Sequence, residues 1–248
     1  MTSDLSIDEE LNLHSVAWEP VEMAFGISVF SVPVGVWTWG SGEISSASQA
    51  HAYAFSGALA RLHADAQRAG AHGVVGVGVE RKISSHSIEV ALTGTAIRPV
   101  GARPIDGSKI FVSDLSAKDF ARLVVAGWMP VGFAHGASFV YAPRRSMGTV
   151  LSQQNQNVEL TNYTAALYTA RENAMERMQA SALSLGGQGV VEVKVDEGPM
   201  AFASHAVCFS AWGTVVTLAS GSHQHLEPIT TVSLNDATVV FNATTLGE

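Results

Sequence analysis

Two stretches of the chain place apolar residues three or four positions apart, which is the spacing of one face of an α-helix. The apolar positions of the first stretch are Phe55, Leu59, Leu62, Ala66 and Ala69. Those of the second stretch are Met175, Met178, Ala182 and Leu185. Gly70 and Gly186 follow, and glycine is common directly after the last turn of a helix. The pattern predicts two long helices, each burying one face.

The segments around these helices have the composition of β-strands. Valine dominates 74–79 and 190–195, directly after the helices. Further strand-like stretches precede the helices and close the pattern, at 21–34, 131–141, 88–98 and 207–218. Each half of the chain is therefore predicted to be β-α-β-β, with its helix packed on an antiparallel sheet, which makes the fold class α+β. Between strand and helix we expect variable segments at 37–49 and 144–158, the second a polar loop.

A short helix is predicted ahead of each first strand. Ser6 and Glu9 form a capping box, and Ser116 with Asp119 repeats it with the shorter acid. We expect these helices to end near Ala17 and near Gly127.

The two halves of the chain correspond in order, which indicates a duplication. Ser3-Asp4-Leu5-Ser6 recurs as Ser113-Asp114-Leu115-Ser116. Further matches are Trp18, Pro20, Gly26, Ser28, Arg61, Val77, His86 and Gly94 with Trp128, Pro130, Gly136, Ser138, Arg177, Val193, His205 and Gly213. The offset grows from 110 (113 − 3) to 119 (213 − 94), as expected where loops lengthened after duplication. We expect a first repeat over 1–109, a second over 110–220 and a C-terminal extension over 221–248.

Each unit has one helix for one sheet, so the other sheet face and the strand edges need cover. The composition agrees, because 47% of the residues are hydrophobic and only 15% are charged. Such a chain is typical of proteins that bury surface against copies of themselves.

The formal net charge is −8, and the only adjacent basic pairs are Arg81-Lys82 and Arg144-Arg145. An acidic chain without a basic stripe argues against a nucleic-acid partner.

No window reaches the ~18 consecutive apolar residues of a membrane span, and the acidic N-terminus lacks the positive-then-apolar order of a signal peptide. Cys208 is the only cysteine, so no intrachain disulfide is possible and a cytoplasmic location is expected.

The run Gly70-Ala71-His72-Gly73-Val74-Val75-Gly76-Val77, with Glu89-Val90 and Gly94-Thr95-Ala96, resembles the YbjQ-like family. In that family Asn-Ala stands in place of His72-Gly73. Residues 183–191 and 212–214 resemble a more diverged second copy, so the resemblance covers under half of the chain. The resemblance implies a dodecin-like β-α-β-β unit that assembles into rings, typically pentamers. The family is often described as heavy-metal-binding. The resemblance transfers no catalytic residue. A tandem chain suggests a ring of five copies with ten units.

Histidines at equivalent repeat positions are the candidate metal ligands. His86 and His205 both follow a serine, and His223 and His225 lie two positions apart. The alternative for the first pair is an inherited Ser-His turn that bonds locally, and for the second a solvated loop. His205 and Cys208 are three apart in a predicted strand, so they point to opposite faces.

No constellation for catalysis or cofactor binding is evident. The chain has no Gly-x-Ser-x-Gly elbow, and the glycine-rich stretch 74–79 lacks the Lys-Ser/Thr of a phosphate loop. Cys208 lies among apolar residues, where a lone cysteine is usually inert. His63 and Asp65 diverge on a helix. We therefore expect no enzyme and no cofactor.

The tryptophans divide into a repeated pair and an unrepeated pair. Trp18 and Trp128 recur ahead of a proline and are interpreted as packing anchors, with a planar-ligand patch as the alternative. Trp37 and Trp39 have no counterparts and are candidates for a ligand or partner contact.

The leading hypothesis is a non-enzymatic, ring-forming homo-oligomer that binds a small ligand or another protein; the alternative is a divalent or heavy-metal-ion binder.

Overall fold

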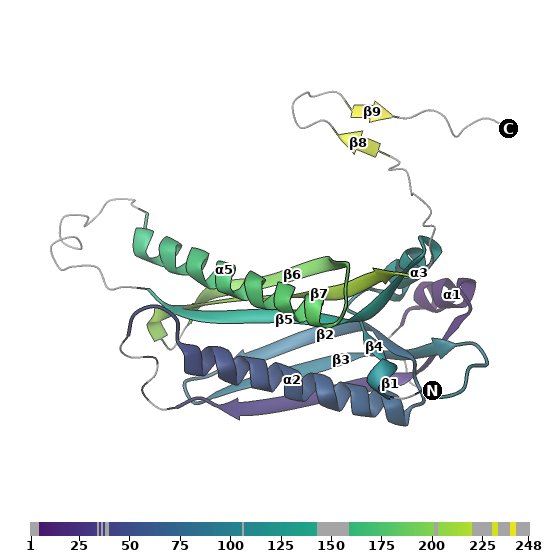
Figure 1. Ribbon diagram of the computed structural model, residues 1–248, viewed down its shortest axis with the longest axis horizontal. Helices are drawn as coiled ribbons and strands as arrows, with labels where there is room; N and C mark the ends of the chain where they lie inside the picture. The colour runs from purple at the N-terminus through teal and green to yellow at the C-terminus, as the bar shows by residue number, and fades with distance from the viewer. Residues whose placement is uncertain are drawn as a thin grey trace.

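The chain folds into two stacked β-α-β-β units, each preceded by a short helix (Figure 1). The computed structural model describes residues 5–33, 35, 37, 40–105, 107–142, 159–200, 203–219, 230–232 and 239–241. The elements of the first unit are α1 (Ile7–Ser15), β1 (Trp18–Ser31), α2 (Ser45–Arg68), β2 (Gly73–Ile83) and β3 (Ser87–Pro99). Those of the second are α3 (Ala117–Val125), β5 (Trp128–Tyr141), α5 (Thr161–Ser184), β6 (Gly189–Met200) and β7 (Ala203–Leu218). The predicted α+β class and its β-α-β-β repeats are confirmed.

Each unit has one sheet, and the segment between the units joins the first. The strand order is β1-β3-β2-β4 in the first sheet and β5-β7-β6 in the second. A 3₁₀ turn (Gly107–Lys109) leads into β4 (Phe111–Val112), which pairs parallel to β2, while the main strands of both units are antiparallel. A hairpin of β8 (Thr230–Val232) and β9 (Val239–Phe241) forms a third sheet.

The short helices begin and end as their sequence predicts. The Ser6 hydroxyl accepts from the Glu9 backbone and the Glu9 carboxylate accepts from the Ser6 backbone, so the capping box is complete. Ser116 accepts in the same way from the Asp119 backbone. Ala17 and Gly127 then take the left-handed conformation, with φ of 60° and 82°. Glycine adopts this conformation without strain and alanine does not, so the second copy has the better terminator.

Each long helix approaches its own sheet closely because glycine faces it. A Cβ atom at Gly26 of β1 would lie 2.1 Å from the Ala58 carbonyl oxygen, and one at Gly136 of β5 would lie 2.0 Å from that of Ala174. Alanines line the buried face of α5, at Ala166, Ala170, Ala174 and Ala182. Small residues on both surfaces therefore set the distance between helix and sheet.

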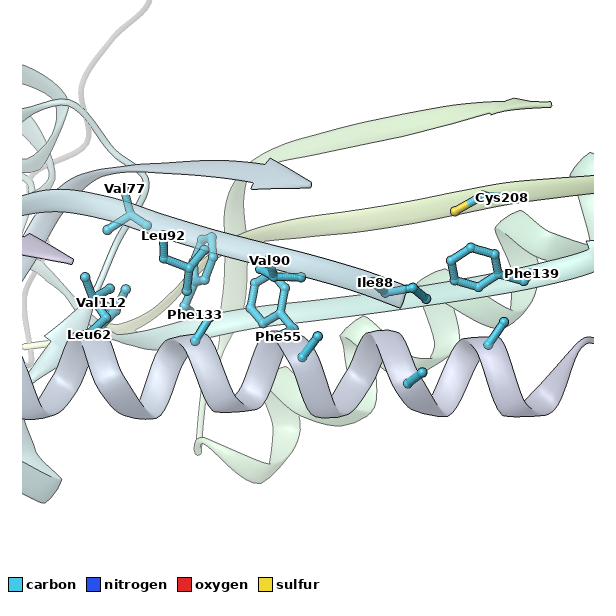
Figure 2. Packing of buried hydrophobic residues seen from close by; sticks show 14 of the residues in the cluster. Phe55, Leu62, Val77, Ile88, Val90, Leu92, Val112, Phe133, Phe139 and Cys208 are labelled. Atoms are coloured by element: carbon cyan, nitrogen blue, oxygen red, sulfur yellow. The ribbon is translucent and has the colours of Figure 1, made fainter. Parts of the chain in front are cut away.

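The main hydrophobic core spans both units. α2 contributes Phe55 and Leu62, β3 contributes Val90, and the second sheet contributes Phe139 and Cys208. In Figure 2 these side chains converge between α2 and strands of both sheets. α2 is thus buried on two sides, and the stacking of the units is part of the core.

We expect Gly26→Ala and Gly136→Ala to destabilise the fold, each near the upper end of the roughly 1–3 kcal/mol typical of overpacking. The added methyl group would meet helix backbone, which cannot move as a flexible side chain does. Thermal unfolding measures the effect. Gly198→Ala is the control, because a Cβ there has no neighbour within 4 Å among the described residues; equal losses in all three variants would contradict the close-approach explanation.

Candidate functional site

The contact between the units is a stack of rings between α2 and β5. Phe55 of α2 lies against His135 of β5 with ring centroids 3.7 Å apart and ring planes within 10°. The Phe55 ring also stacks on Phe133 at 5.8 Å, and Phe139 lies 6.1 Å from the ring of His51. The face of β5 that points away from its own helix is therefore covered by the helix of the other unit.

A carboxylate fixes the polar end of this contact. Glu43, just before α2, accepts hydrogen bonds from Ser48 (2.7 Å), from Ser138 (3.0 Å) and from both terminal nitrogens of Arg177 (2.5 and 2.9 Å). The bond from Arg177 is the main reason why the pKa of Glu43 lies below its ordinary value. The Ile44 backbone also donates to the Phe139 carbonyl (2.7 Å) along the edge of β5. We call Glu43, Ser48, Ser138 and Arg177 the carboxylate clamp.

A buried arginine fixes the other end. The Arg81 side chain of β2 is only 7% exposed and forms an ion pair with Asp196 of β6. Its guanidinium also lies 5.9 Å from the centre of the Trp212 ring and 3.9 Å from the Cys208 sulfur. Burial raises the pKa of the Cys208 thiol, which the nearby Arg81 only partly opposes. Cys208 is thus a buried thiol.

Two neutral histidines lie inside the contact. Burial lowers the pKa of His135 to about 4. The pKa of His51 is also well below its usual value, first because of burial and then because Arg81 and His135 are close. Nδ1 of His51 is buried without a hydrogen-bond partner among the described residues. Protonation of either ring would place a charge between the units.

The two described histidines among those selected from the sequence, His86 and His205, are not part of this ring stack. His86 is exposed in the turn between β2 and β3, where its Nδ1 lies 2.7 Å from the Ser85 hydroxyl. His205 is half-buried on β7. His223 and His225 lie outside the described residues. Within the described part of the chain, no three His, Cys, Asp or Glu side chains are grouped to hold a metal ion.

The tryptophans are mostly structural. Trp18 is buried at the start of β1, with its ring edge-on to Phe111 and Phe120 at 5.8 and 5.2 Å, as a packing anchor requires. Trp37 is buried too; it packs on Phe139 and its indole N–H donates to the Ser85 carbonyl (3.0 Å). The expectation that Trp37 offers a ligand or partner contact was wrong, and Trp39 lies outside the described residues.

One apolar surface was missed by the sequence reasoning. Met23, Phe25, Ile27 and Val29 alternate along β1 and are between 37% and 57% exposed. We call them the β1 stripe. Their counterparts in the second unit are Phe133, His135, Ala137 and Phe139, on the face of β5 that α2 covers. The signal was present in the alternation of these large residues with the matched small residues Ala24, Gly26 and Ser28.

Comparison with known proteins identifies the class. The family model described as "Putative heavy-metal-binding" (YbjQ) matches residues 32–99 and again 149–219, which are the helix and last two strands of each unit. The chain belongs to the YbjQ family and has two copies of its domain.

Named relatives differ in how much of the chain they match. The encapsulin nanocompartment protein Rv1762c of Mycobacterium tuberculosis is 34% identical over 238 residues, 92% of this chain and 89% of that protein. A UPF0145 protein of Halobacterium salinarum is 36% identical over 78 residues, 30% of this chain and 73% of that protein. No solved structure matches the chain. Of the described helices, none is long and apolar enough to cross a membrane.

We expect the contact between the units to weaken in acid. Between the ordinary histidine value of 6.5 and about 4, the unfolded chain takes up a proton that folded His135 does not. Stability therefore falls as pH drops through this window, by on the order of 3 kcal/mol for a shift of this size. His135→Phe, which installs the residue of the first repeat, should flatten the dependence of the melting temperature on pH. His86→Gln is the exposed control, and an unchanged profile in His135→Phe would contradict the assignment.

Proposed function

We propose that this protein is a non-enzymatic scaffold that assembles with copies of itself into a ring. The β1 stripe is the observation that supports the proposal. The same sheet face is buried in the second unit, and leaving several large apolar side chains in water forgoes roughly 1.5–3 kcal/mol for each one that could be fully buried. A closed ring gives every copy the same environment and leaves no uncovered face.

Family membership and the named relative agree with this role. The Mycobacterium tuberculosis relative is named as an encapsulin nanocompartment protein. We favour five copies with ten units, in the cytoplasm, binding a small ligand or another protein on the ring surface. The residues brought together in the contact are aromatic rings, the carboxylate clamp and the ion pair between buried Arg81 and exposed Asp196, and we propose a structural role for all of them.

Native mass spectrometry of the untagged chain tests the assembly. We expect one oligomer of defined copy number at micromolar concentration, and a monodisperse monomer would overturn the proposal. Val29→Asp should reduce the assembled fraction, because it places a charge in the β1 stripe. Val100→Asp is the matched control: Val29 and Val100 are 57% and 56% exposed, and Val100 lies in the turn after β3.

Metal binding is the second candidate, favoured by the description of the family. Because the described residues of one chain contain no group of three donors, His86 and His205 would need ligands from another copy or from 220–229. Under this candidate the untagged protein contains stoichiometric metal after purification, and His86→Ala/His205→Ala weakens its titration with Zn²⁺. Unchanged affinity in that double variant would reject these ligands.

A further inference from the structure

We propose that the β1 stripe is covered by α5 and β6 of a second copy, in a head-to-tail contact that repeats the one between the two units of each chain. The inference rests on the proposed assembly and adds its partner surface and its polarity. Along the ring, each unit would then cover the outer sheet face of the next unit with its own long helix. This arrangement would be the same within a chain and between copies.

The required second surface is exposed on the second unit. In the first unit Val77 of β2, which belongs to the core that spans both units, is 2% exposed, while its counterpart Val193 on β6 is 42% exposed. Val195, the counterpart of Val79, is exposed as well. Beside them a cavity of about 370 Å³ is lined by Thr164, Leu167, Tyr168, Arg171 and Glu197. These five residues correspond to Ser48, His51, Ala52, Phe55 and Arg81, most of which make the contact within the chain.

Half of a second carboxylate clamp is already formed on this surface. Glu159 accepts a hydrogen bond from Thr164 (2.8 Å), as Glu43 does from Ser48 (2.7 Å). The residues after the two glutamates have nearly the same backbone angles, with φ and ψ of −86° and 76° at Ile44 and −84° and 72° at Leu160. The start of α5 is therefore shaped to pair with a strand edge.

The other half of that clamp lies beside the β1 stripe. Ser28 and Arg61 are the counterparts of Ser138 and Arg177. Arg61 is exposed, and its guanidinium donates to the Gly57 carbonyl (3.1 Å) without a carboxylate partner among the described residues. Docked in the same register as the contact within the chain, Glu159 of one copy meets Arg61 and Ser28 of the next.

The residues at the centre of the contact can also stack between copies, although their types differ. Phe55 and His135 correspond to Arg171 and Phe25. An arginine guanidinium stacks favourably on an aromatic ring. In the contact between copies, Arg171 of the helix would therefore stack on Phe25 of the strand, as Phe55 stacks on His135 within the chain.

One contact is not reproduced. The counterparts of Arg81 and Asp196 are Glu197 and Glu80, two acids that repel when they face each other. The contact between copies is therefore expected to be weaker here than the contact within the chain. Glu197→Arg would restore the opposite charges, so we expect it to tighten assembly.

Charge exchange tests the clamp. Arg61→Glu and Glu159→Arg each place like charges in every contact between copies, and each should weaken assembly by roughly tenfold or more. The double variant restores opposite charges in every contact between copies and should recover assembly. Arg103→Glu is the control, an equal change of charge at an exposed loop position. Circular dichroism and melting temperature show whether each variant is folded.

Cross-linking tests the polarity. Glu43 bridges Val140 within the chain, and the counterparts of these residues are Glu159 and Phe30. Under oxidation, a mixture of Glu159→Cys and Phe30→Cys chains should give a covalent dimer that neither variant gives alone. A two-fold contact between β1 strands would instead link Phe30→Cys chains to each other, and that result would overturn the inference.

The two proposals fail in different ways. If the wild-type chain is a monomer, both the proposed assembly and the proposed contact between copies are rejected. If the wild-type chain assembles but the single charge reversals leave its copy number and affinity unchanged, the head-to-tail contact is rejected. The proposed scaffold function is then retained.

Discussion

The packing of one helix against two sheets is the constraint on which the structure depends. α2 lies on its own sheet through the close approach at Gly26 and on the second sheet through the ring of Phe55. α5 has one alanine-lined buried stripe and an exposed opposite face. The two helices descend from the same ancestor and differ in what covers them. The double packing of α2 is therefore one of the contacts that hold the units together, beside the cluster that Leu13 and Trp18 form with Phe120.

The two copies have diverged according to their surroundings. The contact within the chain includes a buried guanidinium and two neutral histidines, groups that are costly to desolvate and that gain from partners held permanently in place. On the equivalent surface of the second unit, Arg171 and Glu197 correspond to Phe55 and Arg81, Leu167 corresponds to His51, and the valines Val193 and Val195 are exposed. Charged and exposed residues suit a surface that stands in water, as the surface proposed to bind a second copy must do before assembly.

Much of the fold follows from local rules in the sequence. The capping serines, the apolar stripes and the valine runs each specify an element without help from distant residues. Helix starts were harder: α2 begins at Ser45, inside the segment 37–49 that was interpreted as variable, because the residue before it, Ile44, offers no side-chain cap. The first strands begin at Trp18 and Trp128, earlier than predicted, since only two residues separate each short helix from its tryptophan.

The contact between the units could not be derived in the same way. His51, Arg81 and His135 are unremarkable in their local sequence and acquire their environment only when the second sheet covers α2. The order of the matched residues reveals the duplication, but it does not reveal which matched positions differ in exposure, such as Val77 and Val193. Conversely, the repeated Ser-His pairs were selected for their similarity and lie outside this contact.

The short strand β4 has a consequence for the order of events during folding. It hydrogen-bonds to β2 and leads within a few residues into α3, so the second unit is tethered at the edge of the first sheet as soon as that sheet forms. A tether this short holds two binding surfaces at an effective concentration in the millimolar range. Contact within a chain is then formed before a freely diffusing copy can compete for the same face of α2. In the proposed assembly, the covalent link thereby decides which surfaces of a newly made chain remain available to a neighbouring copy.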